Sequence, residues 1–122
     1  MALDSLGVCT FAMYQRFDAG LWTDLYRALT GMELTPRELL RGGERAVAVR
    51  RLFNLREGAS RRDDRPPARF VREALPAAGG ERPPLDPARV DQLLDDYYDE
   101  RGWAPDGSIR PETLRALGLD GG

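Results

Sequence analysis

Apolar residues recur at helical spacing along most of the chain, beginning in the segment 21–29. Residues three or four positions apart in a helix lie on the same face, so this segment predicts an amphipathic helix with one apolar face. Gly31 then stands where a glycine commonly ends a helix. The members of this apolar face are Trp22, Leu25, Tyr26 and Leu29.

A second helix begins at a clear start signal, Thr35 followed by Pro36 and Glu38. Threonine fits the N-cap, proline fits the first helical position, and glutamate three residues after the threonine completes a capping box. This helix can extend to Gly58, although the glycine pair 42–43 lies inside it. Each glycine costs about 1 kcal/mol relative to alanine. The pair therefore indicates either close packing against another backbone or a break in the helix.

Two further helices are expected near the C-terminus. An Asp-Pro pair at 86–87 starts the first, and Gly102 ends it. Trp103 then occupies the position that commonly packs back on the last turn of a helix, here near Tyr98. A short final helix is expected over residues 111–117. The apolar positions of the longer helix are Val90, Leu93, Leu94, Tyr97 and Tyr98.

The segment 76–85 interrupts this pattern, because its glycines and prolines break both helix and strand periodicity. No segment has the pattern of a strand. The sequence therefore predicts an all-α fold, an irregular bundle of five or six helices with a mobile Pro/Gly-rich connection. The expected organisation is a helical body over residues 1–75, the flexible connection over 76–85 and a C-terminal helical pair over 86–122. All three belong to one domain or to part of a larger domain.

The composition fits a globular protein, since the 122 residues are 42% hydrophobic and 31% charged. No apolar run approaches the roughly 20 residues that a membrane-spanning helix needs. The first residues carry neither a basic patch nor a long apolar stretch, so no secretory signal is expected. These observations predict a cytoplasmic location and no membrane partner.

Every basic residue is an arginine, and the net charge is only -2, which argues against an overall attraction to nucleic acid. A basic run between residues 50 and 65 can in principle contact phosphates. Only one aromatic residue, Phe53, falls within the run, whereas stacking platforms would interleave several. A solvated or domain-facing surface is therefore the favoured interpretation. The run consists of Arg50, Arg51, Arg56, Arg61, Arg62 and Arg65.

The sequence contains no histidine, which removes the usual general base and the imidazole metal ligand. Its one cysteine, Cys9, cannot form an internal disulfide. Cys9 is expected at the mouth of a helix beginning at Thr10 or Phe11, where the helix N-terminus favours the thiolate that binds iron. The alternative is a buried cysteine that serves as a small hydrophobic residue.

The residues before Cys9 could accompany a bulky cofactor. Gly7 lacks Cβ and lets the backbone adopt positive φ or approach a ligand closely. Asp4 can accept hydrogen bonds from the N–H groups of a heterocycle, although an aspartate before a helix is commonly a cap. A single cysteine cannot hold an iron–sulfur cluster, which needs four protein ligands in its common forms. Any such cluster must take its other three ligands from outside this chain.

Four segments of the chain carry distinctive motifs. Residues 4–9 read DSLGVC, residues 51–64 read RLFNLREGASRRDD, residues 93–103 end in YYDERGW, and residues 114–119 read LRALGL. In this order, they resemble the D-x-x-G-L-C, R-L-F-N-x-R-E-G-x-S-R-x-D-D, Y-Y-x-x-R-G-W and L-x-x-L-G-L motifs at the C-terminal end of the tungsten-containing aldehyde:ferredoxin oxidoreductase family. The resemblance spans nearly the whole chain.

This resemblance implies a role in a cofactor site. It implies that Asp4 hydrogen-bonds a pterin of a bis-pterin tungsten cofactor (tungstopterin) and that the backbone of Gly7 and Val8 passes along the same pterin. Cys9 would be the fourth ligand of a [4Fe–4S] cluster. Val8 replaces the leucine of the family motif, a change that a backbone contact should tolerate.

The resemblance also implies an incomplete enzyme. The C-x-x-C-x-x-x-C triplet that supplies the other cluster ligands is absent, as are the first pterin-binding motif and the acid and histidine near tungsten. The expected function is the C-terminal part of an enzyme that oxidises aldehydes to carboxylates with ferredoxin as acceptor. The expected partners are the N-terminal cofactor-binding part and ferredoxin, and the isolated chain should be inactive, without catalytic residues or bound cofactor. The alternative is a stand-alone helical protein-interaction module without a cofactor.

Overall fold

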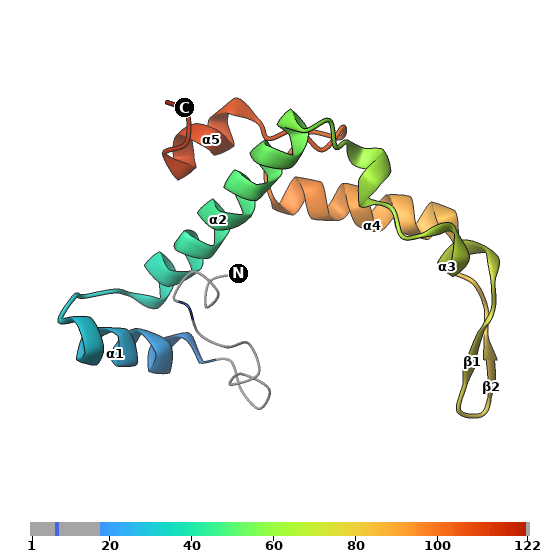
Figure 1. Ribbon diagram of the computed structural model, residues 1–122, viewed down its shortest axis with the longest axis horizontal. Coiled ribbons are helices and arrows are strands. Elements are labelled where there is room, and N and C mark those ends of the chain that lie inside the picture. Colours follow the sequence, from blue (N-terminus) through green and yellow to red (C-terminus); the bar gives the residue numbers. More distant parts are fainter. Residues whose placement is uncertain (1–6, 8–17, 122) are drawn as a thin grey trace. The chain divides into compact units, whose positions relative to one another are not determined.

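The computed structural model describes residue 7 and residues 18–121. The chain divides into two compact units, one comprising Met1–Phe53 with Leu114–Gly122 and the other Asn54–Thr113. The described residues are mainly helical, which confirms the predicted all-α fold class (Figure 1). The elements are α1 (Ala19–Thr30), α2 (Pro36–Arg56), the 3-10 helix η3 (Arg61–Asp64), α3 (Ala68–Arg72), β1 (Leu75–Ala77), β2 (Gly80–Arg82), α4 (Pro87–Glu100) and α5 (Pro111–Leu117).

Helix α1 begins where the Asp18 carboxylate accepts hydrogen bonds from the backbone N–H groups of Gly20 and Leu21, at 2.9 and 3.3 Å. It ends at Gly31, which has the predicted left-handed conformation with φ 73° and donates its N–H to the Arg27 carbonyl. The predicted apolar face is only partly buried. Trp22 and Tyr26 are half-buried beside the buried Thr23, whereas Leu25 and Leu29 are exposed. Helical spacing identified the face but could not tell how much of it the chain itself covers.

Helix α2 starts with the predicted capping box. The Glu38 carboxylate accepts from the Thr35 backbone N–H at 2.8 Å, and the Glu38 N–H donates to the Thr35 hydroxyl at 3.2 Å. The helix is continuous through the glycine pair 42–43, so the break, one of the two alternatives, does not occur. Gly43 is buried, and Gly42 faces open space. The helix ends at Arg56, just before the Gly58 that the sequence marked as its limit.

Acidification is expected to weaken the start of α2. Hydrogen bonds from the Thr35 hydroxyl and then its backbone N–H hold the pKa of the Glu38 carboxyl below its ordinary value of 4.5. Because the folded pKa is the lower one, this stabilisation is complete above pH 4.5 and is lost as the pH falls through the folded pKa. NMR titration of the Glu38 carboxyl measures the shift. Glu38→Gln should keep the cap without this pH dependence, and a Glu38 that titrates at its ordinary value would contradict the prediction.

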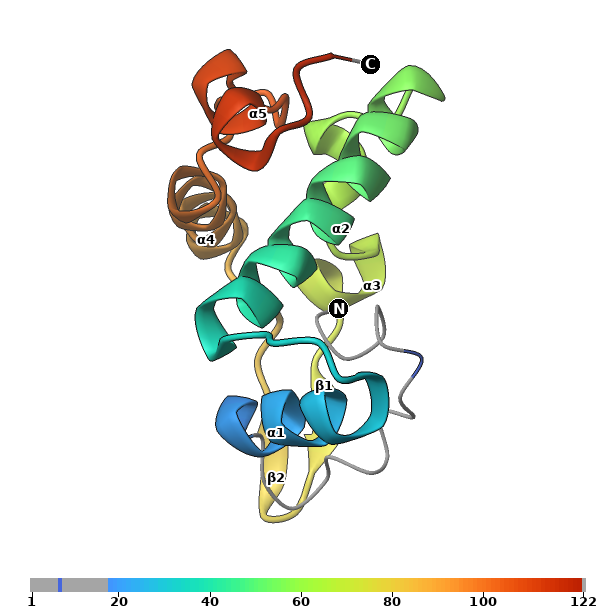
Figure 2. The ribbon, with the colours of Figure 1, turned by 90° about the vertical axis from the view of Figure 1, so that its left-hand side faces the viewer.

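A short antiparallel hairpin lies in the segment that the sequence marked as a flexible connection (Figure 2). Strands β1 and β2 pair with Leu75 opposite Arg82 and Ala77 opposite Gly80. The expectation that no strand forms was therefore wrong here. Three-residue strands are too short to display an alternating pattern, and the reversal depends on Gly79 and Gly80, whose φ values are 96° and 136°. The division of the chain at residues 76–85 stays a prediction.

An aromatic cluster forms the core of the unit 54–113. Tyr98 on α4 is 2% exposed, and Trp103 is 5% exposed, with ring centroids 5.8 Å apart. The backbone N–H of Trp103 donates to the Tyr98 carbonyl at 2.7 Å, and Trp103 forms an isolated β-bridge with the buried Ile109. The predicted packing of Trp103 on the last turn of α4 is therefore confirmed.

Gly102 is needed at the end of α4 for two reasons. Its φ of 65° lies in the left-handed region, and a Cβ at this position would stand 2.4 Å from the Thr113 hydroxyl. That hydroxyl donates to the Gly102 carbonyl at 2.8 Å, which ties α5 to the end of α4. Within the described part of the chain, no helix has the length and apolarity required to cross a membrane.

Candidate functional site

The motif that carries the predicted cofactor contacts lies mostly outside the described residues. Asp4, Val8 and Cys9 fall in the ranges 1–6 and 8–17, and Gly7 alone is described. Gly7 is exposed, with a φ of 71°, and no heavy atom lies within 4 Å of the place where a Cβ would stand. A left-handed backbone and open space at Gly7 suit the close approach of a ligand to the main chain. The roles of all four residues stay predictions.

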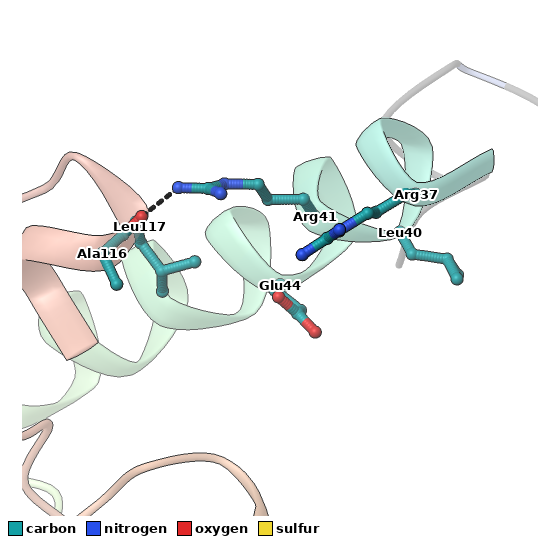
Figure 3. A pocket seen from close by; sticks show the side chains of 6 residues that line it. All are labelled: Arg37, Leu40, Arg41, Glu44, Ala116 and Leu117. Atoms are coloured by element: carbon teal, nitrogen blue, oxygen red, sulfur yellow. Dashed lines mark hydrogen bonds between the residues drawn. The ribbon is translucent and has the colours of Figure 1, made fainter. Parts of the chain in front are cut away.

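An open pocket of about 520 Å³ lies within the unit formed by residues 1–53 and 114–122, between α2 and the end of α5 (Figure 3). The Arg41 guanidinium crosses it and donates to the Ala116 carbonyl, and Arg45, one turn further along α2, donates to the Leu117 carbonyl. The lining residues are Arg37, Leu40, Arg41, Glu44, Ala116 and Leu117.

These two arginines satisfy carbonyl groups that the end of α5 leaves without helical partners. A cation also interacts favourably with the negative end of a helix. The pocket offers one carboxylate, on Glu44, and neither a nucleophile nor a histidine. Its geometry therefore supports a structural contact between α2 and α5 rather than a catalytic centre.

Arg61 is the centre of a polar network within the unit 54–113. Its guanidinium lies 2.6 Å from the Asp95 carboxylate and 5.2 Å from the centroid of the Tyr98 ring. It also donates to the backbone carbonyls of Pro105 and Asp91, at 2.9 and 3.2 Å. One side chain thus joins η3 to α4 and to the loop that follows α4.

Neighbouring groups extend this network. Arg65 pairs with the Asp91 carboxylate, and the Tyr98 hydroxyl donates to the Asp64 carboxylate. Arg51, from the same basic run, is buried. Several members of the run are therefore engaged inside the structure, and the expectation that the run does not bind nucleic acid stays a prediction. The sequence showed the arginines but not their partners, which lie 26 to 44 residues away.

Replacing Arg61 by alanine is expected to destabilise the chain by about 2 kcal/mol, because it leaves carboxylate and carbonyl groups without a charged donor. Arg61→Lys should recover only part of this loss, since an ammonium cannot reproduce the planar fork of a guanidinium. Arg62→Ala is the matched control, because its side chain is 86% exposed and should change the free energy of unfolding by less than about 0.5 kcal/mol. Urea unfolding followed by circular dichroism measures both changes, and equal losses would contradict the assignment.

The loop after α4 contains an aspartate turn. The Asp106 carboxylate accepts from the Ser108 backbone N–H at 2.9 Å and from its hydroxyl at 2.7 Å, and Gly107 has a φ of 84°. An aspartate that bonds two residues ahead is typical of ordinary turns. Among the described residues, no three His, Cys, Asp or Glu side chains gather in a way that could hold a metal ion.

Sequence comparison places the chain among known enzymes. Residues 1–119 match the family model described as aldehyde ferredoxin oxidoreductase, domains 2 and 3. The tungsten-containing aldehyde ferredoxin oxidoreductase of Pyrococcus furiosus is 36% identical over 118 residues, covering 96% of this chain. The Thermococcus kodakarensis protein of the same name is 31% identical over 118 residues. This chain spans 19% of the length of each relative.

One solved structure is similar to this chain in both fold and sequence. It is the active site complex BamBC of benzoyl coenzyme A reductase in complex with 1,5-dienoyl-CoA, with a TM-score of 0.70 and 30% identity. The match covers 85% of this chain and 14% of the other. With a family match over residues 1–119 and relatives that align over 96% of the sequence, this chain belongs to the aldehyde ferredoxin oxidoreductase family.

Proposed function

We propose that this chain is the C-terminal part of an enzyme that oxidises aldehydes to carboxylates and passes the electrons to ferredoxin. The observation that carries the proposal is the family match over residues 1–119, which includes the DSLGVC segment at residues 4–9. The relatives are named tungsten-containing enzymes, and this chain corresponds to about a fifth of each. The remaining four-fifths would supply the rest of the cofactor site.

The donor set of the motif fits one side of a tungstopterin and iron–sulfur site. Asp4 offers a carboxylate acceptor for the N–H groups of a pterin. Gly7 and Val8 would pass their backbone along the ring system, and the positive φ and open space at Gly7 support such an approach. When bound, the metal and the cluster supply the oxidation and electron-transfer chemistry. The chain's part is to bind and orient them.

Cys9 would supply one thiolate ligand to a [4Fe–4S] cluster. Such a cluster needs four ligands, and the sequence holds one cysteine. The other three must come from the cofactor-binding polypeptide. The same segment would then contact the pterin and the cluster within six residues, which keeps the electron donor and acceptor close together. A lone thiol stays reduced in the cytoplasm, which is the compartment we assign to the enzyme.

Metal analysis of two protein forms tests this function. The isolated 122-residue chain should contain neither iron nor tungsten in stoichiometric amount and should not oxidise aldehydes. The protein purified from its source organism through a C-terminal tag should contain both metals. Stoichiometric metal in the isolated chain would contradict the proposal. A metal-free native protein that retains its cellular function after Cys9→Ser would favour the helical interaction module instead.

A further inference from the structure

Helix α1 presents more apolar surface than the structure covers. With 100° of rotation per residue, Leu21, Leu25 and Leu29 lie within an arc of about 80°. They are 54%, 43% and 85% exposed. We call these three residues the leucine stripe. Contiguous exposed apolar residues of this kind commonly mark an interaction surface.

The leucine stripe is distinct from the face that α1 uses within the chain. Thr23 is buried, and Trp22 and Tyr26 are half-buried, on a sector about 110° away from the centre of the stripe. A third sector is polar, where Arg27 pairs with Asp24. As far as the described residues show, the helix thus has a covered face, a charged face and an apolar face that is exposed. The covered face packs within the chain, and the charged face is hydrated by solvent.

We propose that the leucine stripe docks against the cofactor-binding remainder of the enzyme. This inference rests on the proposed function. The chain spans 19% of the length of its curated relatives and 14% of the solved chain that shares its fold. In these proteins, a far longer polypeptide accompanies the same region. That polypeptide could cover the exposed apolar side chains of the leucine stripe. Helix α1 also follows the DSLGVC segment in sequence, which places the stripe near the proposed cofactor contacts along the chain.

This docking would have a direct consequence for the cofactor site. Nine residues separate Cys9 from the start of α1 at Ala19. Anchoring α1 on the partner polypeptide would limit the space that the DSLGVC segment can sample. The stripe would therefore help to bring Asp4 and Cys9 to the same cofactors that the partner holds.

A double variant, Leu25→Glu with Leu29→Lys, tests the docking in two protein forms. Both side chains are exposed in this chain, and glutamate and lysine have nearly the helix propensity of leucine. A glutamate four residues before a lysine is also a favourable pair on a helix. The melting temperature of the isolated chain should therefore stay the same within about 2 °C. In the protein purified from its source organism, the variant should lower the melting temperature by at least about 5 °C, because the charges would be buried. Arg27→Gln, on the charged face, is the matched control and should change neither form appreciably, because it only removes an exposed ion pair.

The outcomes separate the possible occupants. Equal effects of the double variant on both forms would overturn the docking, and so would the absence of any effect. If sedimentation shows that the isolated chain dimerises and that the double variant abolishes the dimer, the occupant is a second copy, which also overturns the proposal. Iron and tungsten are measured on the same samples. If the protein contains both metals but its melting temperature does not respond to the double variant, only the docking is contradicted. If the protein lacks both metals but its melting temperature responds, only the proposed function is contradicted.

Discussion

Replacing Cys9 by serine should remove the iron–sulfur cluster from the assembled protein and lower its rate of aldehyde oxidation by at least about 100-fold. Loss of groups that merely support metal ligands costs about 10- to 100-fold, and loss of a ligand itself should exceed that range. A serine hydroxyl is a poor substitute, because soft thiolates are the ligands that iron–sulfur clusters select. Iron content and the electron paramagnetic resonance signal of the reduced protein measure the cluster directly.

Ser5→Ala is the matched control for this variant. Ser5 lies in the same DSLGVC segment at a variable position of the family motif, and its hydroxyl has no assigned cofactor contact. Iron content, the spectroscopic signal and the oxidation rate should stay within twofold of the unaltered protein, roughly the scatter expected for a neutral substitution. A Cys9→Ser protein that keeps its full iron content would contradict the assigned ligand.

Replacing Trp103 by alanine should destabilise the chain by about 3–5 kcal/mol, the usual cost of removing a buried tryptophan. Trp103 is among the most buried side chains described, and its ring contacts both Tyr97 and Tyr98. Below about 70–80 residues a single core rarely supplies more than about 3–5 kcal/mol, so a loss of this size is comparable to the whole stability of the unit 54–113. The unit 54–113 should therefore be largely unfolded in the variant.

Leu93→Ala provides the comparison, because Leu93 lies on α4 but is 52% exposed. It should change the free energy of unfolding by no more than about 0.5 kcal/mol. Far-ultraviolet circular dichroism without urea measures how much helical structure each variant retains, and urea unfolding measures the free energy of unfolding of Leu93→Ala; neither relies on tryptophan fluorescence. Similar stabilities for the two variants would show that the aromatic cluster is not the core of this unit.

Local signals predicted the helices well. The Thr35–Glu38 capping box, the left-handed Gly31 and the return of Trp103 onto Tyr98 each depend on residues within six positions of one another. Such interactions can be read from sequence because chain connectivity already holds the partners close. The same reasoning explains why the start of α2 and the ends of α1 and α4 lie where the sequence places them.

Features that depend on distant partners could not be predicted. Arg61 reaches Asp95 and the Pro105 carbonyl, and Arg41 reaches Ala116 across 75 residues. The hairpin at β1 and β2 is too short for a strand pattern. The exposure of Leu25 and Leu29 has the same origin, because helical spacing marks an apolar face without saying whether this chain or another covers it.

The candidate cofactor site could not be predicted from local sequence patterns alone. The residue types alone allowed two interpretations of Cys9, a cluster ligand or a small buried hydrophobic residue. The family resemblance favoured the cluster ligand. Gly7 has a φ of 71°, a conformation that glycine adopts readily, and its role as a cofactor contact stays a prediction. Asp4, Val8 and Cys9 lie outside the described residues, so their contacts rest on the family motif.

Native mass spectrometry of the protein as it occurs in its source organism tests the shared cofactor site most directly. The predicted result is one species that contains the Cys9 peptide together with a C-x-x-C-x-x-x-C sequence and that carries the mass of a [4Fe–4S] cluster. Cys9→Ser should remove the cluster mass from that species. A native form that consists of the 122-residue chain alone, without iron, would contradict the account.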